Sequence, residues 1–158
     1  NHRFGSCDWA TADAEIARAA VLAEQVGDHR VWQEARSMQG MSALFQGRFA
    51  DGVVAWRDAQ LSAERSGNWQ IECWALMGQA DNLVRLGRES EAIPLYERAL
   101  ERFAGRARTT EEIWCSGMLA LALLRSGDEA VIKATLSNNL NVIIAALDRA
   151  AVPSGEGE

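Results

Sequence analysis

The stretch that decides the fold runs from Gly87 to Glu101 and reads GRESEAIPLYERALE. After the glycine, Ala92, Tyr96 and Ala99 follow one another at steps of four and three residues, which places them on one face of a helix. A glycine before such a segment supplies the left-handed residue that ends the preceding helix. The stretch therefore predicts a turn followed by an amphipathic helix.

The same pattern recurs at a period of forty residues. Gly47, Gly87 and Gly127 are forty residues apart, and the same shift superposes columns of small and apolar residues on both sides of these glycines. The columns are Gly40, Ala80 and Ala120; Ala43, Leu83 and Leu123; Ala12, Gly52, Ala92 and Ile132; Ile16, Trp56, Tyr96 and Leu136; and Ala19, Ala59, Ala99 and Asn139. A fixed period of about 20 to 50 residues is the signature of stacked repeats. We therefore expect two helices per unit.

The predicted fold is all-α: a right-handed α-solenoid of antiparallel helix pairs with about seven helices. We expect these helices at residues 9–26, 29–46, 50–66, 69–86, 89–103, 109–126 and 129–149. They form one repeat domain over residues 1–151, with a half repeat at 1–26, units at 27–66, 67–106 and 107–150, and a flexible tail at 152–158. Because the half repeat lacks a first helix, we expect the chain to be a fragment of a longer array.

Composition limits the classes of function. The chain has 158 residues, of which 48% are hydrophobic and 24% charged, as in an ordinary globular domain. Its net charge of −6, with no basic cluster, argues against binding to nucleic acid. No apolar run has the length of a membrane span or of a signal peptide core, so we predict a cytoplasmic protein that does not bind membranes.

Metal binding and catalysis are not expected. Cys7, Cys73 and Cys115 are far apart and form no C-x-x-C pair, and His2 and His29 are the only histidines, so we predict buried free thiols and no metal or cofactor.

The acidic pairs of the sequence, Glu89 with Glu91 and Glu111 with Glu112, lie near predicted helix starts, where negative charge is stabilising. We expect them to be exposed and therefore unsuited to acid–base catalysis. The prediction is a protein without enzyme activity.

The turn and helix from Gly87 to Glu101 resemble those of a tetratricopeptide repeat, with Gly87, Ala92, Tyr96 and Ala99 at the characteristic positions. The forty-residue period is longer than the 34 residues of the standard unit and resembles the longer repeats of bacterial signalling and transcription-regulator proteins. More narrowly, residues 46–49 (QGRF) and 71–88 (IECWALMGQADNLVRLGR) resemble the repeat region downstream of the cyclase and ATPase modules of bacterial class III adenylate or guanylate cyclases. The catalytic residues of those enzymes lie in other domains, so none is carried over.

The resemblance implies a ligand-binding groove. In tetratricopeptide arrays the first helix of each pair lines the concave face, and the partner-binding residues predicted by this alignment are Met41, Phe45, Trp74, Met77, Asp81, Arg85, Trp114 and Arg125. Trp74 and Trp114 are one period apart, as are Arg85 and Arg125, and Trp and Arg are common in binding hot spots. The alternative is that the two Trp pack between repeats and the two Arg are solvated helix ends.

The predicted function is that of a non-catalytic protein-interaction or scaffold module, a regulatory fragment of a larger bacterial signalling protein. Its partner would be a peptide or a protein domain, including one of the same parent chain, and the unpaired leading helix would also allow a homodimer. The alternative is a solenoid that senses a small molecule and is coupled to effector domains.

Overall fold

The computed structural model describes residues 8–104 and 109–127, together with residues 133, 137, 140, 141 and 144. The two continuous stretches hold six helices and no strand. The helices are α1 (Trp9–Val26), α2 (His29–Phe45), α3 (Phe49–Ser66), α4 (Trp69–Arg85), α5 (Glu89–Phe103) and α6 (Thr109–Ser126). The all-helical prediction is confirmed, and each of the six expected helices begins and ends within one residue of the observed limits.

Several predictions fall outside the continuous stretches. These are the seventh helix at 129–149, the members of the repeat columns beyond Gly127, and the tail at 152–158. His2 and Cys7 also lie outside the described residues.

Glycines and short polar side chains set the helix limits. Five of the six described helices are followed within two residues by a glycine with φ between 71° and 73°, a conformation that costs other residues energy but not glycine. These glycines are Gly27, Gly47, Gly67, Gly87 and Gly127. On the N-terminal side, the carboxylate of Asp28 accepts a hydrogen bond from the backbone N–H of Val31 at 3.0 Å, and Asp8 and Asn68 cap α1 and α4 in the same way.

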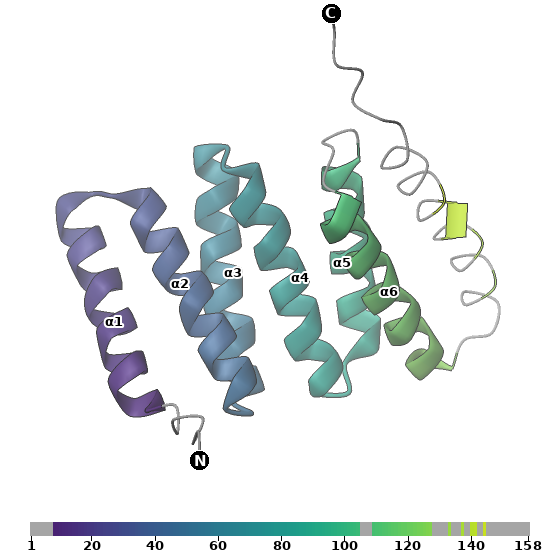
Figure 1. Cartoon of the computed structure of the whole chain (residues 1–158), viewed down its shortest axis with the longest axis horizontal. Coiled ribbons are helices and arrows are strands. Elements are labelled where there is room, and N and C mark those ends of the chain that lie inside the picture. Colours follow the sequence, from purple (N-terminus) through teal and green to yellow (C-terminus); the bar gives the residue numbers. More distant parts are fainter. Residues whose placement is uncertain are drawn as a thin grey trace, which may run out of the picture.

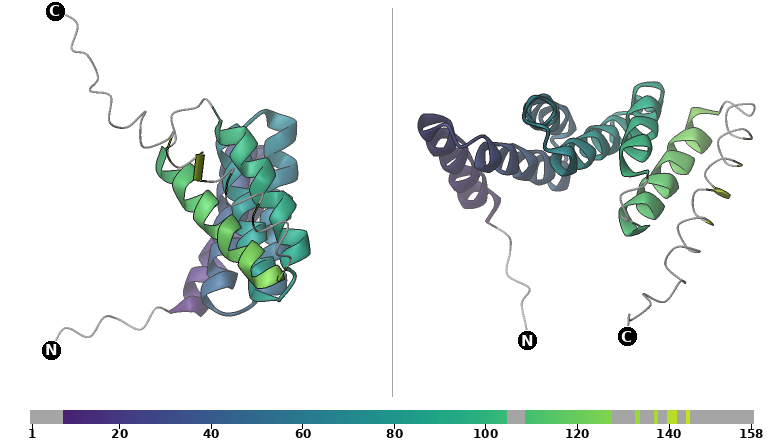
Figure 2. Two further views of the ribbon diagram at one scale, coloured as in Figure 1. Left: turned by 90° about the vertical axis from the view of Figure 1, so that its right-hand side faces the viewer. Right: turned by 90° about the horizontal axis from the view of Figure 1, so that it is seen from above.

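The six helices follow one another across the molecule in chain order (Figure 1), and the view from above in Figure 2 shows the same order. Each helix packs against its neighbours in sequence, and α4 also contacts α2 and α6. Within the described stretches, α1 does not contact α3, and α3 does not contact α5. The helices α2, α4 and α6 therefore form one continuous surface, which we call the even face; in Figure 1 it lies in front of α3 and α5.

The core is made largely of small side chains, which lets the helices approach closely. Ala59, Ala63, Ala80, Ala92 and Ala99 are fully buried between helices. The thiols of Cys73 and Cys115 are also fully buried, as expected, and neither forms a disulfide within the described residues.

Buried polar side chains link successive helices. The amide of Gln33 in α2 donates hydrogen bonds at 3.0 Å to the hydroxyls of Ser62 and Ser66 in α3. It also accepts one at 2.9 Å from Asn68, the residue that caps α4. One fully buried amide therefore ties three helices together, and its hydrogen bonds compensate for its loss of water. None of the helices in the described part of the chain is long and apolar enough to cross a bilayer.

Candidate ligand-binding groove

A pocket of about 330 Å³ opens on the even face. It is lined by Met41, Leu44, Phe45, Trp56, Trp74, Met77, Gly78, Asp81, Arg85, Trp114 and Met118. The structure thus brings seven of the eight predicted groove residues together around one cavity, although they come from three helices and span more than seventy residues of sequence. We call this cavity the even-face pocket.

The floor of the even-face pocket is formed by Trp56, which belongs to α3 and not to the even face itself. Its indole is 3% exposed and lies between two glycines, Gly40 of α2 and Gly78 of α4. A Cβ atom added at Gly40 would lie 2.5 Å from the ring, and one added at Gly78 would lie 2.3 Å from it. The two glycines therefore provide the space that lets a side chain from behind reach the groove.

The walls of the pocket are aromatic and sulfur-containing. Trp74 in α4 is 40% exposed and Trp114 in α6 is 49% exposed. At the α2 end, Phe45 stacks on Trp9 of α1 with ring centroids 6.2 Å apart. The thioethers of Met77 and Met118 also line the cavity, and such unbranched side chains adapt to differently shaped ligands.

Asp81 places a carboxylate in this apolar setting. It is partly buried and accepts a hydrogen bond from the hydroxyl of Tyr96, which is itself fully buried in α5. Burial raises the pKa of the Asp81 carboxyl above its usual value, while the Tyr96 hydrogen bond and the nearby charge of Arg85 act in the opposite direction. Burial and the neighbouring Asp81 likewise raise the pKa of the Tyr96 hydroxyl, which therefore remains a donor. The pocket thus holds a carboxylate that water stabilises poorly.

The two arginines that are one period apart have different surroundings. Arg85 lines the even-face pocket, is exposed, and makes no hydrogen bond or ion pair within the part of the chain that the structure describes. Arg125 does not line the pocket, because its guanidinium donates to Glu89 of α5 at 2.8 Å and to the backbone carbonyl of Val84 at 3.4 Å. Of the two, only Arg85 is placed to meet a ligand in the pocket.

Sequence reasoning did not include Trp56, Gly78 and Met118 in the site. Trp56 lies in the second helix of its unit, which the resemblance assigns to the opposite face. A usable signal was present, since Gly40 and Gly78 stand inside helices, where glycine costs about 1 kcal/mol relative to alanine. Such a cost indicates a packing or binding requirement at both positions.

The acidic pairs differ in part from the expectation that they are exposed. Glu91 is exposed, as predicted, and pairs with Arg88 at 2.6 Å, whereas Glu89, which pairs with Arg125, is half-buried. Glu111 is also half-buried, so the prediction of exposed side chains holds for Glu91 alone and is wrong for the other three. Glu112 is the most deeply buried, at 2% exposed. It lies forty residues after Glu72, which is also buried and pairs with Arg102 at 2.8 Å. The repeat thus places an acidic side chain inside the packing, a position that a pattern of charges near a helix start does not reveal.

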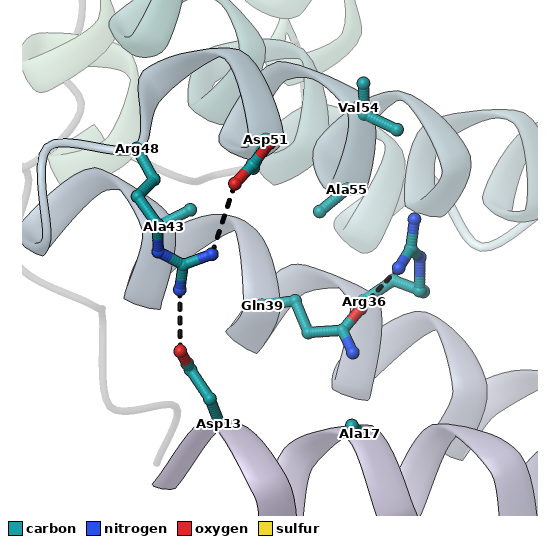
Figure 3. A pocket seen from close by; sticks show the side chains of 9 residues that line it. All are labelled: Asp13, Ala17, Arg36, Gln39, Ala43, Arg48, Asp51, Val54 and Ala55. Carbon is teal, nitrogen blue, oxygen red and sulfur yellow. Dashed lines mark hydrogen bonds and ion pairs between the residues drawn. The ribbon is translucent and has the colours of Figure 1, made fainter. Parts of the chain in front are cut away.

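A second cavity of about 390 Å³ lies between α1, α2 and α3 (Figure 3). Its charged groups are already paired: Arg48 donates to Asp13 at 2.6 Å and to Asp51 at 3.3 Å, and Arg36 donates to Gln39 and to Asp58 outside the cavity lining. These contacts join the three helices. The cavity is therefore explained by the packing of α1 against the next unit, and the even-face pocket is the better candidate site.

Comparison with known proteins gives no assignment: the sequence matches no model of a protein family and no curated protein. Within the described residues, no three His, Cys, Asp or Glu side chains are grouped closely enough to hold a metal ion.

Proposed function

We propose that this chain is a non-catalytic binding module, a right-handed solenoid of antiparallel helix pairs similar to long tetratricopeptide repeats, whose even face binds a peptide or a segment of another protein domain. One observation carries the proposal. Side chains of α2, α4 and α6, among them Trp74 and Trp114 at equivalent positions, converge on a single pocket rich in Trp and Met. Large aromatic side chains that remain accessible in a cavity are typical of binding hot spots.

The packing of the helices supports a curved solenoid. Turns of a few residues join consecutive helices, which favours an antiparallel arrangement of neighbours. Among the described helices, α2 contacts α4 and α4 contacts α6, whereas α1, α3 and α5 do not contact one another, as expected for an array whose even face is the inner, concave side. A concave face with an apolar pocket at its centre suits an extended ligand.

A small-molecule sensor is the second candidate, and the size of the even-face pocket favours it. At about 330 Å³ the cavity lies at the lower end of the 300 to 1,000 Å³ that small-molecule sites occupy. The same volume also accommodates one large side chain of a peptide. We favour the peptide because Phe45, 68% exposed, and Trp9 continue the aromatic surface beyond the cavity.

The partner-binding role is tested with a random peptide library displayed on phage and selected against the immobilised protein. Peptides selected by the unmodified protein should lose binding to the Trp74→Ala, Trp114→Ala double variant, while far-UV circular dichroism remains unchanged. Trp32→Ala is the matched control, because Trp32 lies by a different cavity, at the turn between α1 and α2. Equal binding to all three proteins would contradict the role of the groove.

The sensor alternative predicts a different result. A panel of metabolites should then include a compound that raises the melting temperature of the unmodified protein but not of the double variant. If the chain is a peptide-binding module, no metabolite of the panel should raise its melting temperature. The proposed membership of a larger bacterial signalling protein is tested separately, by sequencing the gene on both sides of this segment for a cyclase or ATPase module.

A further inference from the structure

The chemistry of the even-face pocket indicates which side chain a partner presents to it. Two charged groups line the cavity, and their solvation differs. Arg85 is exposed, so water already stabilises its charge. Asp81 is partly buried among apolar side chains, and the hydroxyl of Tyr96 is the one hydrogen-bond donor to it within the described residues. An ionised carboxylate can accept about four hydrogen bonds, so most of the capacity of Asp81 is unused.

The walls around Asp81 favour a cation. Trp74 and Trp114 are both partly accessible and line the same cavity, and the faces of Trp rings attract ammonium and guanidinium groups within about 6 Å. The flexible thioethers of Met77 and Met118 provide an apolar surface for the methylene stem of a long basic side chain. The net charge of −6 further attracts positively charged partners over distance.

We propose that the even-face pocket receives a lysine or arginine side chain of a partner peptide, with its stem against Met77 and Met118, its charge between the Trp rings and its tip at the Asp81 carboxylate. This inference rests on the proposed function and adds the chemistry of the ligand. It assigns Asp81 as the residue that selects the ligand. Arg85, on the same helix one turn later, opposes the incoming cation and limits its affinity.

The experiment uses three pools of short synthetic peptides that share the same mixed flanking residues and differ in one fixed central residue. That residue is lysine, norleucine, which has an unbranched apolar side chain without the amino group, or glutamate. Binding to the full chain is measured by fluorescence anisotropy. We expect the lysine pool to bind about tenfold more tightly than the norleucine pool. The ammonium group can form cation–π contacts with the Trp rings and a charge-assisted hydrogen bond with the carboxylate, and norleucine can form neither.

Two variants separate Asp81 from general charge effects. Asp81→Asn keeps an acceptor for the Tyr96 hydroxyl but removes the charge, and it should weaken lysine-pool binding by about thirtyfold or more and abolish the preference over norleucine. Asp51→Asn changes the net charge equally but lies at the other cavity, and it should leave the preference intact. Arg85→Gln should strengthen lysine-pool binding about two- to fivefold, because an opposing exposed charge is removed.

The outcomes distinguish this inference from the proposed function. Equal binding of the lysine and norleucine pools, tighter binding of the glutamate pool, or weaker lysine binding in Arg85→Gln would overturn the inference, while peptide binding itself would still support the groove. Failure of all three pools to bind, together with no effect of the Trp74→Ala, Trp114→Ala double variant in the library selection, would overturn both.

Discussion

The contact between Gly78 and Trp56 allows a quantitative test of how the even-face pocket is built. In Gly78→Ala the new methyl group would lie 2.3 Å from Cε2 of the indole, whereas ordinary contact begins at 3.4 Å, so the ring would have to move by about 1.1 Å. Movement of the ring toward α2 is limited, because the ring already lies close to Gly40, where an added Cβ atom would be only 2.5 Å from it.

The magnitude follows from two opposing effects. Overpacking of a filled site costs about 1 to 3 kcal/mol, and a ring confined on two sides falls at the upper end. Replacing a glycine inside a helix by alanine stabilises the helix by about 1 kcal/mol. We therefore expect Gly78→Ala to lower the free energy of unfolding by about 2 kcal/mol, which corresponds to a melting temperature about 4 to 8 °C lower for a chain of this size.

Gly117 provides the matched control. It lies inside α6, and a Cβ atom added there would contact nothing within 4 Å. Gly117→Ala should therefore raise the melting temperature by about 2 to 4 °C. Thermal and urea unfolding followed by circular dichroism measure both variants. If Gly78→Ala were as stable as Gly117→Ala, or if its penalty persisted in a Trp56→Leu background in which the ring is absent, the packing argument would be refuted.

Three further outcomes are expected. Asp81→Asn should melt at a higher temperature than the unmodified protein at neutral pH, because burial raises the pKa of this carboxyl and folding therefore disfavours its charge; the advantage over Asp81 should disappear as the pH falls through that raised pKa. Asp13 should show the opposite sign, because its hydrogen bond with the Ser42 hydroxyl is the main cause that lowers the pKa of its carboxyl. The stabilisation that this carboxylate provides should be lost as the pH falls below the usual pKa of aspartate, so the free energy of unfolding of Asp13→Asn should depend less on pH in the acid range. Burial raises the pKa of the Cys115 thiol, so at neutral pH it should react with a thiol reagent only after denaturation, which mass spectrometry before and after urea would establish.

The helix limits could be predicted from the sequence because the determinants are local. A glycine after five of the six described helices and an amphipathic period of three to four residues within the helices leave few alternatives. The convergence of Trp74 and Trp114 could also be anticipated, since residues at equivalent repeat positions share a surface when units stack.

The remaining features depend on pairings across the fold that periodicity does not encode. The position of Trp56 in the groove depends on missing side chains at Gly40 and Gly78, and a repeat pattern treats all three residues as ordinary packing. The different surroundings of Arg85 and Arg125 arise because Glu89 on α5 lies within reach of only the second arginine. Such differences between equivalent positions arise because individual residues that contact them in the fold differ from one repeat to the next.

The neighbour-only packing of the helices determines how the chain opens. Among the described helices, α1 touches only α2, whereas α4 touches α2, α3, α5 and α6. Contacts of this kind join segments that are close in sequence, so forming them costs little loop-closure entropy. Unfolding can therefore proceed by detaching one helix at a time. Amide protons of α1 should therefore exchange with solvent through local unfolding that costs little free energy. Exchange of the amide protons of α4 should require cooperative unfolding of the array.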